Sequence, residues 1–199
     1  MGLSFGLACG SQGVGSQELM VTEVDVWAHA GAQDSFVRSE ATFPAFIGGY
    51  RSGKTAGGVI KAWLYTDKYP GAIGVWTEPV AAMFQESLLP TLRKFFRDYE
   101  GGLWEEQGRG GPNHRIEFTN GCRWLLKAAE TPDRIVGFEA AWALMNEAGS
   151  SKYGSQEDAY FRLVGRLSQQ GYPHWLGIAT TPEGLNWLWR EWVESPTSK

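Results

Sequence analysis

The sequence predicts an α/β fold in which a mostly parallel central β-sheet is flanked by helices and carries one β-hairpin. Through most of the chain, short apolar runs alternate with stretches in which apolar residues recur at helical spacing. This alternation is typical of a parallel sheet with crossover helices. In addition, Asn120-Gly121 separates two runs of alternating polarity, and Asn-Gly favours a hairpin because both turn residues take positive φ. A chain of 199 residues is long enough for one domain of this class.

The elements of the first half follow from this alternation. Residues 1–20 are rich in Gly, Ser and Gln and are expected to form a mobile tail, with the folded domain over residues 21–199. The expected elements, in chain order, are a short helix over 33–39, a strand over 45–48, a helix over 54–65, a strand over 72–76 and a helix over 80–96. Pro90 is expected to kink or split the last of these helices.

The second half contains the hairpin and a further alternation. Five glycines and a proline favour a loop over 99–113. The expected elements after it are hairpin strands over 115–119 and 122–128, strands over 140–145 and 175–179, and helices over 157–167 and 185–193. Most of the ten tryptophans fall on apolar faces and are expected in the core: Trp63, Trp76, Trp142, Trp175, Trp187 and Trp192. Trp104 lies in the glycine-rich stretch and is a candidate contact for a partner or for DNA.

The composition argues against several classes of protein. Lys and Arg total 18 against 22 Asp and Glu, a net charge of −4, so the chain is not expected to hold nucleic acid by bulk electrostatics. Two cysteines, Cys9 and Cys122, are too few for a disulfide framework and favour a reducing compartment. No apolar run reaches the roughly 18 residues of a membrane span, and the N-terminus lacks the basic region of a secretory signal. We therefore expect neither membrane insertion nor secretion.

The clearest motif is a phosphate-binding loop. Residues 48–55 fit the pattern G-x-x-x-x-G-K-[ST] and lie between an expected strand and an expected helix. The glycines let backbone N–H groups face phosphate oxygens, and the helix N-terminus favours the same anion. We expect Lys54 to reach the β- and γ-phosphates of ATP and Thr55 to give an oxygen ligand to Mg²⁺. The candidate nucleotide-binding residues of the loop are Gly48, Gly49, Tyr50, Arg51, Ser52, Gly53, Lys54 and Thr55.

A second acidic element follows the apolar run at residues 141–145. In P-loop ATPases that hydrolyse with a glutamate, such a strand ends in an Asp that holds the Mg²⁺ shell and then a Glu that activates water. Glu147 is therefore the candidate catalytic carboxylate. Asn146 stands in the place of the Asp and is the candidate metal-shell residue. Its amide oxygen can accept a hydrogen bond from a metal-bound water, but it carries no charge, so we expect it to hold Mg²⁺ less well.

Taken in order, these motifs resemble the ATPase domain of the large terminase subunit, the DNA-packaging motor of tailed bacteriophages. The resemblance covers most of residues 33–193 and implies an ASCE (RecA-like) P-loop NTPase fold. It includes a Walker A segment, the approach to a Walker B strand and a coupling motif. The segments that carry it are residues 33–38, 46–55, 76–90, 120–121, 132–137, 142–148 and 178–184.

The resemblance implies a function and several residue roles. It implies hydrolysis of ATP that drives double-stranded DNA into a preformed capsid in the cytoplasm of the infected host. The implied partners are the portal protein, the small terminase subunit and neighbouring copies in a ring, with a monomer in isolation. Gln33 would contact adenine, and Thr180 and Thr181 would couple hydrolysis to movement. An arginine finger is also implied, either Arg134 in trans or Arg51 in cis. Large terminases carry a C-terminal nuclease domain, which the sequence does not contain, so no nuclease activity is expected.

Two other functions stay open on the sequence. Asn146 favours a weakly hydrolysing, nucleotide-binding assembly module that docks on the portal. Another P-loop ATPase, such as one lobe of a helicase, also has these motifs, although a helicase core usually needs two such lobes.

Overall fold

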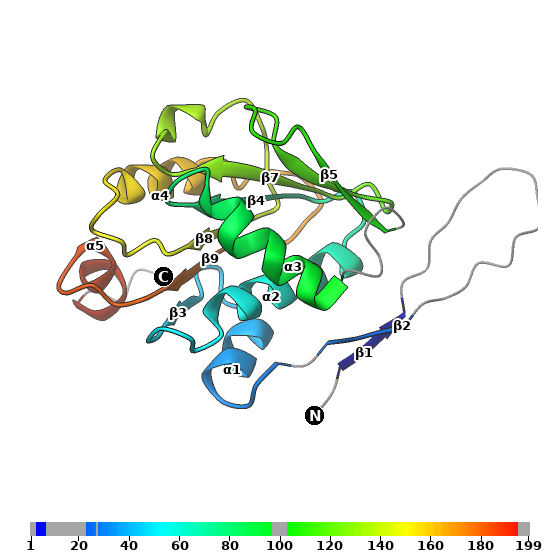
Figure 1. Ribbon diagram of the computed structural model, residues 1–199, viewed down its shortest axis with the longest axis horizontal. Helices are drawn as coiled ribbons and strands as arrows, with labels where there is room; N and C mark the ends of the chain where they lie inside the picture. Colours follow the sequence, from blue (N-terminus) through cyan, green and yellow to red (C-terminus); the bar gives the residue numbers. More distant parts are fainter. Residues whose placement is uncertain (1–2, 7–22, 27, 97–102, 195–199) are drawn as a thin grey trace, which may run out of the picture.

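A computed structural model of the chain describes residues 3–6, 23–26, 28–96 and 103–194. Its centre is a seven-stranded sheet with the strand order β3-β9-β8-β4-β7-β6-β5 (Figure 1). In that order the strands are β3 (Ala45–Ile47), β9 (Trp175–Thr180), β8 (Trp142–Asn146), β4 (Ile73–Glu78), β7 (Arg123–Ala128), β6 (Arg115–Phe118) and β5 (Trp104–Gln107). The first five are parallel, and β6 and β5 extend the sheet in antiparallel pairing. The predicted α/β class is confirmed, and Asn120-Gly121 joins β6 to β7 as expected, although only Gly121 of the two turn residues has a positive φ.

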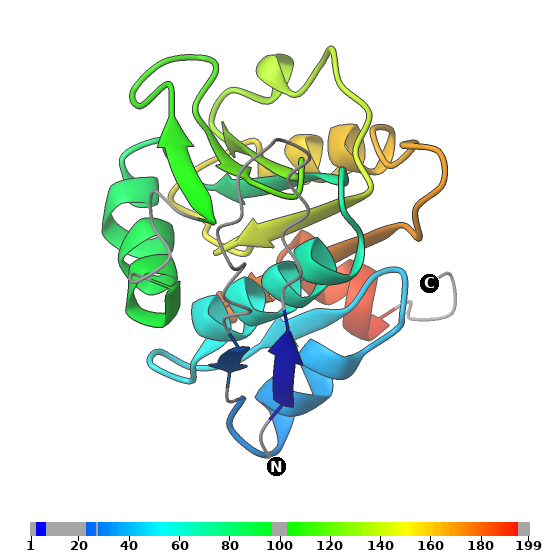
Figure 2. The same ribbon diagram turned by 90° about the vertical axis from the view of Figure 1, so that its right-hand side faces the viewer.

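Helices cover both faces of the sheet (Figure 2). One face carries α1 (Ala32–Arg38), α2 (Lys54–Lys68), the π-helical turn η1 (Phe84–Leu88) and α3 (Leu89–Phe96). The other carries α4 (Gln156–Val164), α5 (Trp187–Trp189) and the π-helical turn η4 (Arg190–Glu194). The helix expected over 80–96 is shorter at its start and changes without a break from the π-helical turn η1 to α3 just before Pro90, which has no N–H for the helical ladder. The last helix begins at Trp187 because the Asn186 side chain caps it.

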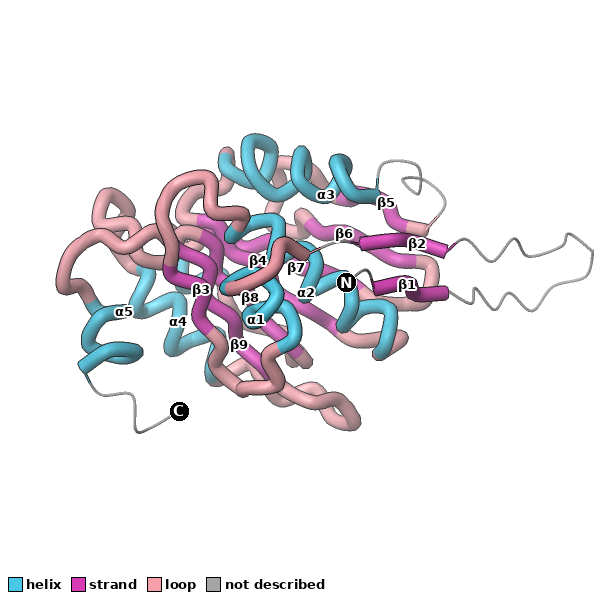
Figure 3. Tube along the Cα trace, turned by 90° about the horizontal axis from the view of Figure 1, so that it is seen from below, coloured by secondary structure: helices cyan, strands magenta, loops and turns pink. Residues whose placement is uncertain are grey.

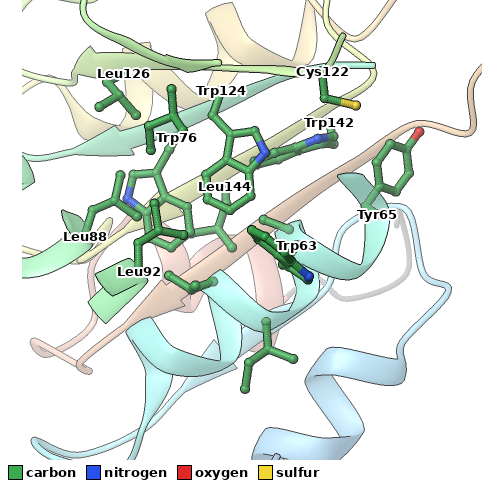
Figure 4. Close-up of a cluster of buried hydrophobic side chains, with 14 of the residues drawn as sticks. Trp63, Tyr65, Trp76, Leu88, Leu92, Cys122, Trp124, Leu126, Trp142 and Leu144 are labelled. Carbon is green, nitrogen blue, oxygen red and sulfur yellow. The ribbon is translucent and has the colours of Figure 1, made fainter. Parts of the chain in front are cut away.

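Stacked tryptophans fill the core between α2, α3 and the sheet (Figure 4). Trp76, Trp124 and Trp142 are fully buried, and the ring of Trp142 stacks on that of Trp175 with centroids 5.3 Å apart. Gly74 makes room for this stack, since a Cβ there would lie 1.9 Å from the Trp142 ring. The predicted core positions are confirmed for Trp63, Trp76, Trp142 and Trp175, whereas Trp187 and Trp192 are half-buried on the α4 face.

The prediction for Trp104 is wrong. Its side chain is 1% exposed, and its Nε1 donates to the carbonyl of Phe96 at 2.9 Å. The stretch expected as a loop contains the edge strand β5, which pairs with β6 and turns Trp104 toward the core. The glycines of this stretch flank the strand, so composition hides it.

A separate two-stranded ribbon precedes the domain (Figure 3). β1 (Leu3–Gly6) pairs antiparallel with β2 (Glu23–Val26). Residues 3–6 are thus a strand within the expected tail, and the rest of that tail, including Cys9, lies outside the described residues. Cys122 is a buried free thiol. Within the described ranges, we find no helix with the length and apolarity needed to cross a bilayer.

The strand order also determines where a ligand would bind. Because β3, β9, β8, β4 and β7 are parallel, their carboxyl ends meet at one edge of the sheet, which is where open α/β sheets bind ligands. β9 lies between β3, which precedes the phosphate-binding loop, and β8, which precedes Glu147. This arrangement confirms the predicted ASCE (RecA-like) P-loop fold.

Candidate nucleotide-binding site

The phosphate-binding loop runs from β3 into α2. Helix α2 begins at Lys54, and Gly53 before it has a φ of 82°, a left-handed conformation that glycine adopts without strain. A Cβ at Gly53 would also lie 2.6 Å from Nε2 of Gln33. The N–H of Gly48 donates to the carbonyl of Thr180 at 3.0 Å, which ties the loop to β9. The loop therefore ends at the N-terminus of a 15-residue helix, where free backbone N–H groups favour a phosphate.

Lys54 is folded back over this loop. Its Nζ donates to the carbonyl of Gly49 at 3.0 Å and lies 3.8 Å from Oε1 of Glu147. The lysine is 5% exposed, so its charge is held close to the loop rather than in bulk water. The structure thus brings the predicted phosphate ligand and the predicted catalytic carboxylate together.

The side chains of Asn146 and Thr55 lie within hydrogen-bond distance at the edge of the sheet, close enough for both to contact one metal ion or its water shell. The hydroxyl of Thr55 donates to Oδ1 of Asn146 at 3.3 Å. Hydroxyl and amide oxygens are of the ligand type that Mg²⁺ takes. The described residues contain no group of three or more His, Cys, Asp or Glu side chains that could hold a metal by themselves. A cation here would take its other ligands from phosphate and water, as Mg²⁺ usually does.

Glu147 occupies a strained position directly after β8. Its φ is 50°, which is uncommon for a residue other than glycine and is a feature of functional sites. The conformation is held on both sides. Its N–H donates to the carbonyl of Ala179 at 2.7 Å, and its Oε2 accepts the N–H of Thr181 at 3.2 Å. The side chain is 26% exposed, so the carboxylate faces both Lys54 and solvent.

The two threonines after β9 differ in what their hydroxyls do. Oγ1 of Thr180 accepts the N–H of Gly149 at 2.8 Å and donates to the carbonyl of Thr181 at 3.2 Å. Oγ1 of Thr181 is buried and has no hydrogen-bond partner among the described residues. A buried hydroxyl without a partner is costly, and this one belongs to the residue whose N–H holds Glu147. Of the two predicted coupling residues, Thr181 therefore has the free hydroxyl.

Solved structures resemble the chain, whereas no protein-family model and no curated protein matches it. The large terminase of a thermophilic bacteriophage, in complex with ADP, aligns with a TM-score of 0.63 at 16% identity, over 83% of this chain and 42% of the other. The large terminase ATPase domain of Thermus phage P74-26 gives 0.52 at 19% identity, over 82% and 69%. The bacteriophage Phi-29 genome packaging motor assembly gives 0.54 at 12% identity, over 79% and 49%.

The chain has the fold of a phage large-terminase ATPase domain. At identities of 12% to 19% the likeness concerns the fold alone, and there it confirms the resemblance that the motifs predict. The chain spans between 38% and 42% of the length of the large-terminase chains from the thermophilic bacteriophage. That large terminase has been solved with ADP and with ATP-γ-S.

In this terminase-like domain, Gln33 lies beneath the phosphate-binding loop. Its Nε2 donates to the carbonyl of Gly53 at 2.7 Å, and its Oε1 accepts the N–H of His29 at 2.6 Å. With 4% of its surface exposed, Gln33 supports the start of α2. Its expected contact with adenine stays a prediction.

The two candidate arginine fingers lie far apart in the terminase-like fold. Arg51 is in the loop itself, exposed beside Tyr50, which is 82% exposed. Arg134 ends the short 3₁₀ helix η3 (Pro132–Arg134), which follows β7. β7 is four strands away from β3 in the sheet, roughly 19 Å at about 4.8 Å per strand. Arg134 thus follows a strand that is not adjacent to the loop of its own chain, and the role of each arginine as a finger stays a prediction.

Sequence reasoning missed Glu78, the last residue of β4. It is fully buried, and its carboxylate accepts the Nε1 hydrogen of Trp76 at 3.0 Å and the amide of Asn146 at 3.0 and 3.1 Å. Burial raises its pKa to about 8, the hydrogen bonds from Asn146 and Trp76 oppose that rise, and the Glu147 charge adds to it. An acid that ends an apolar run is the signal that identified Glu147, and the same signal was present at residues 73–78.

Proposed function

We propose that the chain hydrolyses ATP with Mg²⁺ and that this hydrolysis drives double-stranded DNA into a preformed capsid. The observation that carries the proposal is the meeting of Lys54, Glu147 and the Thr55–Asn146 pair at the carboxyl edge of the sheet. Each group has a task in phosphoryl transfer, and the fold is that of terminase ATPase domains.

Each polar residue of the site has a separate role in the proposed reaction. Lys54 would leave the Gly49 carbonyl and bind the β- and γ-phosphates, and Glu147 would then orient a water and take its proton. Thr55 and Asn146 would hold the Mg²⁺ shell, and the cation when bound would neutralise charge on the phosphates. Thr181 would contact the γ-phosphate through its free hydroxyl, while its N–H donates to the carboxylate of Glu147. Loss of the γ-phosphate would therefore change the contacts of a residue that directly follows β9, and so couple hydrolysis to movement of that strand.

The arginine finger is proposed to come from a neighbouring copy. Arg134 is exposed and separated from its own phosphate-binding loop by several strands, so it would act in trans in a ring on the capsid. Arg51 is the cis alternative, because its place in the loop puts it beside the phosphates. A charge supplied by a neighbour would couple hydrolysis to assembly.

A basic groove is the proposed contact for the DNA backbone. The groove has a volume of about 840 Å³ and lies beside β6 and β7 on the α4 face of the sheet. Four basic side chains line it against one carboxylate, that of Glu139, and the basic residues are Arg115, Arg123, Lys127 and Arg166. Arg123 and Arg166 form no ion pair with the described residues, and Nε of Arg166 is buried without a hydrogen-bond partner there. In a chain of net charge −4, a local cluster of this kind is what would attract phosphate groups.

The proposal extends to partners and location. The structural neighbours are phage large terminases and a genome packaging motor. The chain would accordingly work in the cytoplasm of an infected bacterium with the portal protein, the small terminase subunit and further copies of itself.

The second candidate is a nucleotide-binding assembly module that hydrolyses weakly. Asn146 favours it, because an amide brings no charge to the metal shell. A helicase lobe is a third interpretation of the same motifs, but the solved neighbours reported above are terminases and a packaging motor.

Phosphate release from ATP separates these functions. We expect phosphate release that needs Mg²⁺. If Arg134 acts in trans, the rate per protein molecule should rise with protein concentration, and DNA and portal should raise that rate further. Lys54→Ala serves as the control for a contaminating ATPase, since it should lose all turnover. Nucleotide binding without turnover, at any concentration and with DNA and portal present, would favour the assembly module instead.

A further inference from the structure

The carboxylate of Glu78 holds the amide of Asn146 in place. β4 and β8 are adjacent and parallel, and Thr77 is in register with Met145, so their last residues lie level at the sheet edge. Nδ2 of Asn146 donates to both carboxylate oxygens of Glu78, at 3.1 and 3.0 Å. The same nitrogen lies 3.2 Å from Oγ of Ser87 in the π-helical turn η1. Two separate elements therefore anchor one end of this side chain.

This anchoring determines which end of the amide faces Thr55. Oε1 of Glu78 accepts the Nε1 hydrogen of Trp76, and both carboxyl oxygens of Glu78 lie within hydrogen-bond distance of Nδ2 of Asn146, so the amide nitrogen faces Glu78 and the amide oxygen faces the other way. On that side, Oδ1 accepts the hydroxyl hydrogen of Thr55 at 3.3 Å. Without the anchor, the amide could turn over and present its NH₂ group to Thr55. An NH₂ group cannot coordinate a cation or accept a hydrogen bond from a metal-bound water.

We propose that Glu78 is a positioning residue of the metal site, and that Glu78 and Asn146 together replace the single acidic residue expected at position 146. The inference rests on the proposed function, because it concerns the Mg²⁺ of bound ATP. It adds that the acidic group of the site stands on β4 rather than on β8. Glu78 acts through Asn146 and does not touch the nucleotide.

The contact between Glu78 and Asn146 predicts how substitutions at the two positions affect each other. Asn146→Asp alone restores the expected motif, but it places two carboxyl groups about 3 Å apart in a buried site, where they cannot both be ionised and must share a proton. Glu78→Gln alone lets the Asn146 amide turn over, because an amide at position 78 can either donate or accept. Making both changes exchanges the roles: the new amide donates to the new carboxylate, which keeps an oxygen toward Thr55. Both single variants should therefore be defective, and the double variant should recover.

The experiment measures how much Mg²⁺ strengthens nucleotide binding. A fluorescent ADP is titrated into wild type, Glu78→Gln, Asn146→Asp and the double variant, once with Mg²⁺ and once with EDTA, and the ratio of the two affinities is taken. Glu105→Gln, the same change on an exposed glutamate of β5, is the matched control. We expect similar affinities in EDTA, a ratio that falls by about 10-fold or more in each single variant, as for other residues that orient metal ligands, and recovery in the double variant. Ser87→Ala, which removes the second anchor, should give a smaller fall.

Each other outcome overturns a specific claim. A wild-type protein that binds no ADP either with Mg²⁺ or in EDTA overturns the proposed function, whereas one that binds ADP without a gain from Mg²⁺ overturns only the inference. A Glu78→Gln variant with an unchanged ratio, or a double variant no better than the single ones, also overturns the inference. The thermal unfolding midpoint of each protein is recorded without nucleotide. If a single variant does not fold, Ser87→Ala and the double variant are used instead. The inference is then overturned if Ser87→Ala has the wild-type ratio of ADP affinity with Mg²⁺ to that in EDTA and the double variant gains nothing from Mg²⁺.

Discussion

The ammonium nitrogen of Lys54 lies 3.8 Å from Oε1 of Glu147, so the phosphate ligand and the catalytic base of the proposed reaction neutralise each other. A phosphate that bound Lys54 would compete with Glu147 for the ammonium. Binding would therefore release the carboxylate toward solvent, where 26% of its surface is already exposed. The pairing links the arrival of nucleotide to the availability of the base.

Lys54→Ala should weaken nucleotide binding. Removing a charge-assisted hydrogen bond to phosphate costs about 1.5–3 kcal/mol, or roughly 10-fold to 150-fold in affinity. Titration with a fluorescent ADP in the presence of Mg²⁺ measures this. Lys152→Ala, at an exposed lysine, is the control and should bind as wild type does. Equal affinities for wild type and Lys54→Ala would remove Lys54 from the site.

Glu147→Gln should separate binding from hydrolysis. The amide oxygen can still accept the N–H of Thr181, so the local structure and the affinity for ADP should persist. An amide cannot take a proton from water, and loss of a general base costs about 10²-fold to 10⁴-fold in rate. Phosphate release and ADP titration on the same preparation test both parts. Hydrolysis at the wild-type rate would show that another residue activates water.

Thr180 and Thr181 should respond differently to valine. Thr180→Val leaves the N–H of Gly149 without its acceptor in a buried place, so the free energy of unfolding should fall by about 1–3 kcal/mol. Thr181→Val removes a hydroxyl that has no partner among the described residues, so stability should hold while phosphate release falls. Urea unfolding and phosphate release are measured for both. A stable Thr181→Val protein with full turnover would contradict the proposed role of this hydroxyl.

Local patterns in the sequence predicted much of the site, because its parts are encoded in short segments. Gly53, Lys54 and Thr55 are consecutive at the start of α2, and Glu147 follows one apolar run. Apart from the hairpin of β6 and β7, the pairings between strands could not be predicted from local patterns. The contact of Glu78 with Asn146 depends on β4 and β8 being neighbours although they are far apart in the chain.

The errors in the fold have the same origin. Trp104 belongs to a strand that exists because it pairs with β6, and that pairing outweighs the glycines around it. The ribbon of β1 and β2 likewise joins segments separated by residues that show no periodicity. Composition predicts what a segment prefers alone, whereas these strands depend on a partner.

Glu106 should make stability depend on acid pH. Burial would raise the pKa of this carboxylate, but hydrogen bonds from Arg109, His114 and Gln85 and the charge of Arg109 outweigh it and hold the pKa at about 2. Because the folded pKa lies below the ordinary value near 4.5, the stabilisation is complete above about pH 4.5 and is lost as the pH falls toward 2.

The measurement compares the free energy of unfolding of wild type with that of Glu106→Gln from pH 6 to pH 2. The difference should be on the order of 1–2 kcal/mol at pH 6, because the partner Arg109 is exposed and water screens its charge, and it should shrink steadily below pH 4.5. Glu105→Gln, the exposed neighbour on the same strand, should show no such trend. A difference between wild type and Glu106→Gln that does not change with pH would mean that the carboxylate acts through packing rather than through its charge.

The basic groove should account for contact with the DNA backbone. Arg123 and Arg166 line it without ion pairs to the described residues, so their charges are available to phosphates. Substituting both with alanine should weaken binding of double-stranded DNA and should reduce the slope of log affinity against log salt by about 2, since each phosphate contact contributes about 1. Fluorescence anisotropy at several salt concentrations measures both quantities. Arg38→Ala removes one arginine charge from α1 on the opposite face, where Arg38 pairs with Asp34, and should leave the slope unchanged. If the double variant and Arg38→Ala behave alike, the DNA runs over another surface. The net charge of −4 makes that comparison informative, because the rest of the chain offers no general attraction that could hide the loss.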